Sequence, residues 1–211
     1  MKIYTYPGAP NPRRVDIYLA EKGIEVPRET VDIMKGRTRS PEFIETINAA
    51  GGVPVLELDD GSHIAESVAI CRYFEALHPT PPLFGSTPEE IARIEMWNRR
   101  IELNYMMPVG QVWIHGSPLT KAVMKHQIEE VAETNRGIVR RYHRFLDEQL
   151  ANREYIAGDA FTMADILALT TMDFASELVK LPCDPGLTNL AAWHARVSGR
   201  PSAKAGLPAR P

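Results

Sequence analysis

Three short segments near the N-terminus carry side chains that could bind or activate an anionic, peptide-like ligand. The first spans residues 8–14 (GAPNPRR), between a predicted strand and a predicted helix. Asparagine favours the N-cap position and proline the first helical position, so Asn11 followed by Pro12 predicts a helix start capped by Asn11. The NH₂ group of Asn11 could then donate to an anion above the positive end of the helix. A role as a helix cap alone explains the same pattern.

The second segment is Val53-Pro54 and the third is Glu66-Ser67. A proline in an apolar strand pattern is typical of an edge strand. In the cis form it would instead leave the Val53 backbone to pair with a peptide as an added strand. Glu66 and Ser67 stand at a predicted helix start, where capping is their ordinary role. All three segments fall at one end of the predicted sheet and together fit a small zwitterionic peptide.

The elements that position these segments alternate over residues 1–78. Strands are predicted over 2–6, 26–31, 53–58 and 62–64, and helices over 12–22, 41–47 and 66–77. Asp59-Asp60-Gly61 is a hairpin signal between the last two strands. The order combines a parallel crossover with a terminal antiparallel hairpin, which predicts a thioredoxin-like α/β domain.

Residues 79–88 (PTPPLFGSTP) hold four prolines and predict a linker. Residues 89–211 carry helical patterns, so an all-α bundle is expected there. Its predicted helices span 89–115, 120–150, 163–180 and 187–199. Thr162 and Asp165 form a capping-box pattern, a structural motif without a catalytic role.

Composition excludes several classes of protein. The chain has 211 residues with 24 Lys+Arg against 27 Asp+Glu, which disfavours a partner rich in phosphate such as nucleic acid. It lacks both a membrane-length apolar stretch and an apolar leader, so we expect a cytoplasmic protein without a membrane partner. Cys71 and Cys183 are too few for a zinc site or a disulfide framework and are expected to be small buried hydrophobic residues. No metal is expected.

Over essentially its whole length the chain resembles the cytosolic glutathione transferases. The resemblance is carried by the segments YPGAPNPRRVDIYLAEKGI, INAAGGVPVLELDDG, AESVAICRYF and FTMADILAL. It implies a homodimer in which residues 1–78 bind glutathione and residues 89–211 form most of the pocket for a hydrophobic electrophile. Glutathione would be the co-substrate.

The resemblance also implies roles for individual residues. Val53 and cis Pro54 would pair with the cysteine backbone of glutathione. Glu66 and Ser67 would hold its γ-glutamyl group. Arg39 matches a position where relatives often have a lysine that binds the glycine carboxylate.

The first loop departs from the family pattern. Relatives often activate the glutathione sulfur with a Tyr, Ser or Cys, but the matching positions here are Ala9 and Pro10. The loop is most similar to that of members with Thr-Pro-Asn-Gly, with Ala9 replacing the threonine and Pro12 the glycine. Asn11 is kept, and we therefore expect it to favour the thiolate form of glutathione. Gly52 stands where relatives often have a residue that touches glutathione.

Candidate pocket residues lie on the first long helix of the second part. Tyr105, Val109 and Trp113 share one face of it, although an ordinary core stripe gives the same pattern. Pro108 is expected to kink this helix. Tyr6, at the end of the first strand, is a weaker candidate for contact with the sulfur or the pocket.

The leading functional hypothesis is a glutathione-dependent transferase, whose thiolate attacks an electrophile or the sulfur of a mixed disulfide. The alternative is a non-catalytic, transferase-like protein that binds a partner or acts under stress. The missing hydroxyl at Ala9 and the missing basic residue at Gly52 keep this alternative open.

Overall fold

The computed structural model describes residues 1–208, which fall into two compact units. The first unit contains residues 1–83 and the segment that begins at Arg200, and the second contains residues 84–199. The chain passes from one unit to the other at Leu83 and Phe84, which are both buried, within the predicted linker. The boundaries differ from the prediction at the C-terminal end, since residues after 199 belong with the first unit and not with the helical one.

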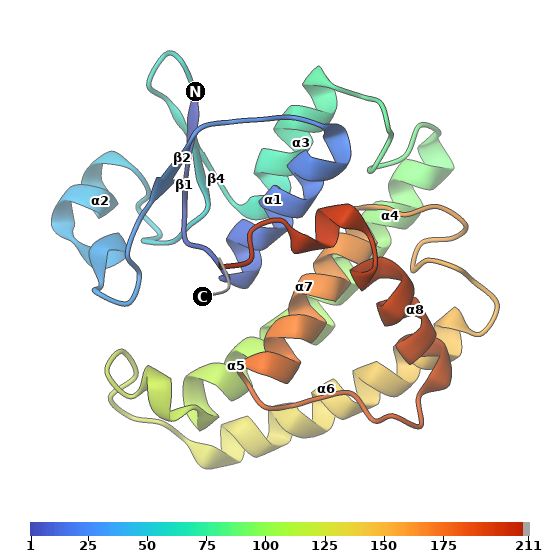
Figure 1. The fold of residues 1–211 in the computed structure, drawn as a ribbon. Helices are drawn as coiled ribbons and strands as arrows, with labels where there is room; N and C mark the ends of the chain where they lie inside the picture. The colour runs from blue at the N-terminus through green and yellow to red at the C-terminus, as the bar shows by residue number, and fades with distance from the viewer. Residues whose placement is uncertain (209–211) are drawn as a thin grey trace. The chain divides into compact units, whose positions relative to one another are not determined.

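A four-stranded sheet forms the centre of the first unit (Figure 1). Its strands are β1 (Lys2–Thr5), β2 (Arg28–Thr30), β3 (Val55–Glu57) and β4 (His63–Ala65), in the order β2-β1-β3-β4. β1 is parallel to β2, and the pairs β1–β3 and β3–β4 are antiparallel. This topology confirms the predicted thioredoxin-like α/β fold.

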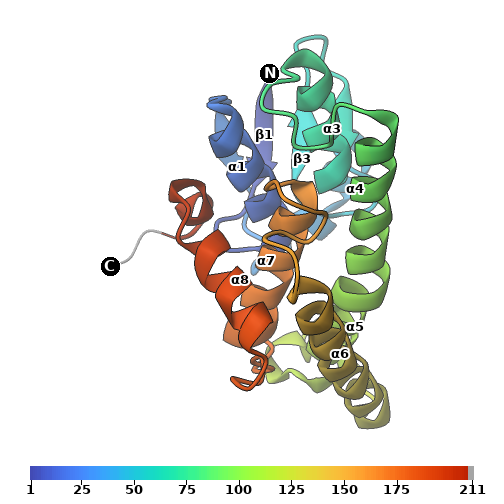
Figure 2. The ribbon, with the colours of Figure 1, turned by 90° about the vertical axis from the view of Figure 1, so that its right-hand side faces the viewer.

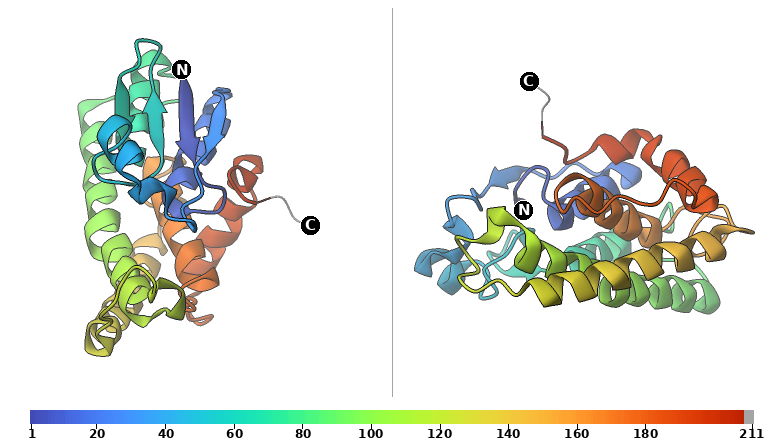
Figure 3. Two further views of the ribbon diagram at one scale, coloured as in Figure 1. Left: turned by 90° about the vertical axis from the view of Figure 1, so that its left-hand side faces the viewer. Right: turned by 90° about the horizontal axis from the view of Figure 1, so that it is seen from below.

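Three α-helices cover the two faces of this sheet. They are α1 (Pro10–Lys22), α2 (Pro41–Thr46) and α3 (Ser67–Leu77), with the short η1 (Arg37–Arg39) before α2. α1 and α3 lie side by side on one face, as Figures 1 and 2 show, and α2 covers the other (Figure 3). α2 begins as expected, because Ser40 Oγ accepts a hydrogen bond from the Phe43 N–H at 3.2 Å.

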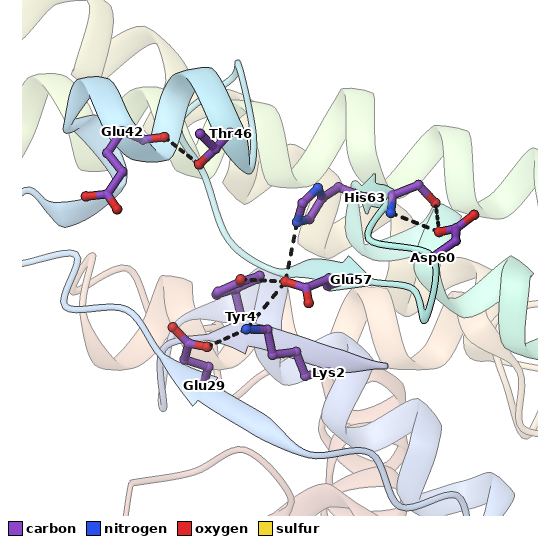
Figure 4. A network of polar contacts seen from close by, with 9 residues as sticks. Lys2, Tyr4, Glu29, Glu42, Thr46, Glu57, Asp60 and His63 are labelled. Carbon is purple, nitrogen blue, oxygen red and sulfur yellow. Dashed lines mark hydrogen bonds and ion pairs between the residues drawn. The ribbon is translucent and has the colours of Figure 1, made fainter.

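The sheet face under α2 combines an apolar cluster with a polar network. Tyr4 packs against Phe43 and Val55, and its hydroxyl donates to Glu57 at 2.6 Å (Figure 4). Lys2 Nζ lies 2.9 Å from the Glu29 carboxylate and 3.4 Å from that of Glu57. The hydrogen bond from Tyr4 lowers the pKa of Glu57. Each carboxylate thus has a partner on a neighbouring strand, so the network stabilises the sheet.

The second unit is helical, as predicted. Its α-helices are α4 (Pro88–Ile101), α5 (Met107–Gly116), α6 (Glu129–Leu150), α7 (Met163–Glu177) and α8 (Thr188–Ser198). A five-residue π-helical segment, η2 (Glu102–Met106), joins α4 to α5. Within it the Met107 N–H donates five residues back, to Glu102. The irregular turn therefore lies directly before Pro108, which has no N–H to donate.

The prediction of one helix over residues 120–150 was wrong at its start. α6 begins only at Glu129, and residues 117–128 form a connection that includes η3 (Pro118–Thr120). The Gln127 side chain donates to the carbonyl groups of Ile114 (3.0 Å) and Ser117 (2.7 Å). These bonds satisfy carbonyls near the C-terminal end of α5 and hold the connection against it. Figure 3 (right) shows α6 alongside α5.

No helix in the described part of the chain is long and apolar enough to cross a membrane.

Candidate active site at one end of the sheet

Strand register brings the three candidate segments to the same end of the sheet. Tyr4 is paired with Val55, and Val55 with Ala65. The C-terminal end of β1, the start of β3 and the end of β4 therefore lie in one row. The loop after β1, the Val53-Pro54 pair and the start of α3 all leave the sheet at this row. The predicted convergence is confirmed.

The structure corrects the predicted start of α1. The helix begins at Pro10, with Ala9 at the N-cap position, and Asn11 is the second helical residue. Both prolines fit here because N–H groups in the first turn have no partner within the helix. Asn11 therefore does not cap the helix.

The Asn11 side chain is half-buried, and its polar atoms are not engaged by other described residues. Its Oδ1 is buried, and its amide forms no hydrogen bond with any residue in the described range 1–208. Most buried polar groups in proteins have a partner, so an amide without one at a helix N-terminus is a candidate ligand contact.

The segment before β3 presents backbone groups to the same end of the sheet. The Val53–Pro54 peptide bond is cis, as the resemblance implied. Within residues 1–208, the N–H and C=O of Val53 form no backbone hydrogen bond. The preceding turn is ordered by Asn48, whose Nδ2 donates to the Gly52 carbonyl at 2.9 Å. Gly51 has φ +64°, and a side chain there would come within 2.9 Å of the Thr38 carbonyl oxygen.

The start of α3 combines an exposed carboxylate with a helix N-terminus. Glu66 occupies the N-cap position with φ +70°, a left-handed conformation that is uncommon outside glycine. Such outliers often occur at functional sites. Ser67 follows and is buried, and its Oγ accepts a hydrogen bond from Arg14 Nη1 at 3.4 Å. An anion can be held here by the free N–H groups of the first turn.

Arg14 is a buried cation next to this site that sequence reasoning missed. Its side chain is 4% exposed and reaches Ser67 of α3. The neighbouring Arg13 is also buried and donates to the carbonyl of Ala203 at 2.9 Å. Arginine is rarely buried without partners, and the adjacent pair Arg13-Arg14 between Pro12 and Val15 was the signal that the sequence offered.

Two further predicted residues lie near this end of the sheet. Arg39 is exposed, and its Nη1 lies 3.4 Å from the Ala50 carbonyl oxygen, beside the turn that leads to Val53. Tyr6 is half-buried directly after β1, and its carbonyl accepts from the Ala9 N–H at 3.2 Å. Their positions are compatible with ligand contact, and their roles stay predictions.

The structure contradicts two of the predicted pocket residues. Tyr105 and Val109 have no exposed surface. The Tyr105 hydroxyl lies 2.7 Å from His143 Nε2, and its ring stacks on Tyr142. Both residues therefore belong to the core of the helical unit and not to an open pocket wall. Trp113 is half-buried, so it alone of the three keeps a surface that could meet a ligand.

The two thiols are poorly suited to redox chemistry. Cys71 is fully buried, and burial raises its pKa. Cys183 is half-buried, unlike the prediction, and burial with help from Asp184 and Asp147 raises its pKa to about 11. Both are protonated at neutral pH. No group of three or more metal-ligating side chains occurs within residues 1–208.

A thioredoxin-like unit whose polar side chains and backbone groups converge at one end of its sheet, followed by a helical unit, defines a two-domain class of protein. Residues 3–82 match the model of the glutathione S-transferase N-terminal domain, and residues 112–201 match that of the C-terminal domain. The chain belongs to the glutathione S-transferase family, and glutathione-dependent transfer is the activity of that family.

Individual relatives agree with this assignment. The chain is 41% identical to Glutathione S-transferase 2 of Saccharomyces cerevisiae, over 97% of this chain and 88% of the relative. The crystal structure of Gtt2 from that yeast superposes with a TM-score of 0.91, covering 97% of this chain and 99% of that one. A glutathione S-transferase domain-containing protein from Marinobacter aquaeolei is 40% identical, with a TM-score of 0.90 over 96% and 99% of the two chains.

Proposed function

We propose that this transferase activates the glutathione thiol at the N-terminus of α1, with Asn11 as the group that stabilises the thiolate. The observation that carries the proposal is the uncommitted amide of Asn11, half-buried at the positive end of the helix. Its NH₂ group can donate to a sulfur anion. A free thiol has a pKa of about 8.5, so a decrease of one unit raises the thiolate fraction at neutral pH about tenfold.

The rest of the tripeptide would be held by groups at the same end of the sheet. The unpaired N–H and C=O of Val53 suit the cysteine backbone of glutathione. The Glu66 carboxylate suits the γ-glutamyl ammonium group, while Ser67 and the N-terminus of α3 suit its carboxylate. Arg39 suits the glycine carboxylate. Each chemical group of a zwitterionic tripeptide thus has a complementary partner.

The thiolate would then attack a hydrophobic electrophile, displacing its leaving group, or attack the sulfur of a mixed glutathione disulfide, displacing the second thiolate. Among the predicted pocket residues, Trp113 in the second unit is half-buried and keeps surface for ligand contact, and so does Tyr6 in the first unit. The same activated thiolate serves both reactions.

We also propose a homodimer, supported by an apolar stripe on the α4–η2–α5 helical stretch. Met96, Leu103 and Met107 are 39%, 53% and 54% exposed. Met96 lies two turns before Leu103, and Leu103 lies one turn before Met107, so the three share one face, with Arg99 and Arg100 in the turn between the first two. Exposed apolar residues in such a row are typical of a protein interface.

Asn11→Asp tests the assignment of the thiolate-stabilising group. A carboxylate at the second helical position interacts favourably with the helix dipole, so the variant should fold and keep its Tm. Its negative charge should repel the thiolate. We expect kcat/KM with chlorodinitrobenzene to fall at least about tenfold, together with the ultraviolet absorbance of bound thiolate at neutral pH. Asn152→Asp adds the same charge at an exposed position of the second unit and is the control.

Equal activity in the unmodified protein and Asn11→Asp would refute the role of Asn11. A failure of millimolar glutathione to raise the Tm of the unmodified protein would instead favour the non-catalytic alternative, since a ligand that binds the native state stabilises it.

A further inference from the structure

The chain returns to the first unit after α8 and packs along α1. Residues 200–208, here called the C-terminal strap, include η4 (Pro201–Lys204), which contacts α1. In Figures 1 and 2 the strap is the red segment beside the dark-blue helix α1. It runs from the C-terminal half of α1 toward the loop that precedes the helix.

A partly buried ion pair between Arg200 and Glu21 anchors the start of the strap. Arg200 donates from Nε and Nη2 to the two carboxylate oxygens of Glu21, each at 2.8 Å. The Ser202 hydroxyl donates to the same carboxylate. Burial alone would raise the pKa of Glu21, but the hydrogen bonds from Arg200 and Ser202 outweigh it and lower the pKa. A bidentate, charge-assisted pair of this kind fixes geometry well.

The middle of the strap lies in close contact with the first half of α1. Arg13 Nη2 donates to the carbonyl of Ala203 at 2.9 Å. Gly206 has φ +71°, and a Cβ there would lie 2.6 Å from Asp16 Oδ2 and 3.1 Å from Arg13 Cα. Only glycine fits this conformation and this distance, so a side chain at this position would push the strap away from the helix.

The end of the strap bonds to the loop that carries Asn11. The carbonyl of Gly206 accepts from the Gly8 N–H at 2.8 Å. The helix has no side-chain cap of its own, because its N-cap residue is Ala9. The backbone bond from Ala9 to Tyr6 and the bond from Gly8 to the strap therefore both restrain the turn that leads into Asn11.

A neighbouring face of α1 is held by α3. Arg14 donates to Ser67 at 3.4 Å, and Lys22 lies 2.6 Å from the Glu75 carboxylate. Positions 14 and 22 are eight residues apart and share a face, whereas the strap contacts Arg13 and Glu21, one position earlier in each case. The helix is thus held by both α3 and the strap.

We propose that the C-terminal strap positions the thiolate site, with Gly206 as the positioning residue. The Gly206 carbonyl fixes the Gly8 N–H, the loop then holds the first turn of α1, and that turn sets where the Asn11 amide meets the glutathione sulfur. This inference rests on the proposed role of Asn11. Gly206 itself does not touch the substrate.

Gly206→Ala tests the proposal, with Gly61→Ala as the matched control. Gly61 also has a left-handed conformation, φ +82°, but a Cβ there has nothing within 4 Å, and it lies in the β3–β4 turn. We expect Gly206→Ala to raise the pKa of enzyme-bound glutathione by about one unit, measured from thiolate absorbance against pH, and to lower kcat about tenfold. The KM for glutathione should change less than kcat, since Val53 and Glu66 lie outside the loop. Gly61→Ala should leave both values unchanged.

Hydrogen exchange of the Gly8 amide provides a second measurement. It should be slow in the unmodified protein and faster in Gly206→Ala. If Gly206→Ala does not fold, Arg200→Gln, which removes the ion pair with Glu21, should raise the thiol pKa in the same direction.

An unchanged thiol pKa and kcat in a folded variant would overturn the proposal, as would fast exchange of Gly8 in the unmodified protein. Absence of a thiolate signal in the unmodified protein would refute the proposed function, and with it the positioning role of the strap. A normal thiolate signal that the strap variants leave unaltered would reject the strap's role alone.

Discussion

The indole N–H of Trp193 donates a 2.8 Å hydrogen bond to Oδ1 of Asp165, and both side chains are buried in the second unit. The same carboxylate accepts from the backbone N–H groups of Ile156 (3.0 Å) and Thr162 (2.9 Å). The Thr162 hydroxyl also donates to it, at 3.2 Å. Burial raises the pKa of Asp165, and these four donors act against that rise. The predicted capping box therefore also ties α7 to α8 and to the segment before α7.

Asp165→Ala should destabilise the protein far more than the loss of an ordinary cap. It removes the acceptor of four buried donors, so we expect the free energy of unfolding to fall by about 3 kcal/mol or more. Glu90→Ala is the matched control, because Glu90 closes an exposed capping box with Thr87 at the start of α4. That change should cost about 1 kcal/mol. Denaturant unfolding compares the two, and equal losses would show that the interior bonds contribute nothing.

Asn11→Ala should separate chemistry from helix capping. Asn11 is not the cap of α1, so its removal should change the free energy of unfolding by less than about 0.5 kcal/mol. Activity should still fall, because the thiolate loses its donor. Thermal melting and kcat/KM measured on one preparation test this expectation. A large drop in Tm with unchanged kcat/KM would assign Asn11 a structural role instead.

The buried His143 should make stability depend on pH. Burial lowers its pKa from 6.5 to about 4. Between these values the unfolded chain binds a proton that the native state does not, so stability falls as the pH drops through this window. The full effect is about 3 kcal/mol.

His143→Gln should flatten this part of the pH dependence while keeping a side chain that can accept from the Tyr105 hydroxyl. Urea unfolding at several pH values between 4 and 7 compares the two proteins. If the free energy of unfolding depends on pH in the same way in both proteins, His143 has the same pKa in the native and the unfolded state.

Leu103→Glu should break the proposed homodimer. A carboxylate in the centre of an apolar interface loses its hydration without gaining a partner. Light scattering after size-exclusion chromatography should then report a monomer. Leu119→Glu is the control, since Leu119 is 61% exposed in the connection after α5, away from the stripe. A dimer that survives Leu103→Glu would place the interface elsewhere.

Capping and turn residues predicted the fold correctly where the conformation of a segment depends on neighbouring residues in the sequence. Ser40-Pro41 marked the start of α2, and Asp59-Asp60-Gly61 marked the β3–β4 turn, because capping and turn geometry depend on adjacent residues. The start of α1 was misplaced because two prolines both fit a first helical turn. The start of α6 was misplaced because Gln127 bonds to carbonyls ten or more residues earlier, which no local pattern reveals.

The candidate site was predictable as a set of segments but not in its supporting contacts. Asn11, Val53 and Glu66 stood out by residue type and by their place at the ends of elements. The roles of Arg14 and Gly206 depend on partners far along the chain, at Ser67 and Gly8. Tyr105 and Val109 were misassigned because a core stripe and a pocket wall share one helical spacing.

The C-terminal strap also has a consequence for synthesis. A ribosome makes the chain from its N-terminus, so β1 to α3 emerge long before residues 200–208. Until the helical unit has been made, Glu21 lacks its partner Arg200, and the Gly8 N–H lacks the Gly206 carbonyl. The first unit is therefore the last to be completed, and a fragment that stops at residue 83 lacks part of its own fold.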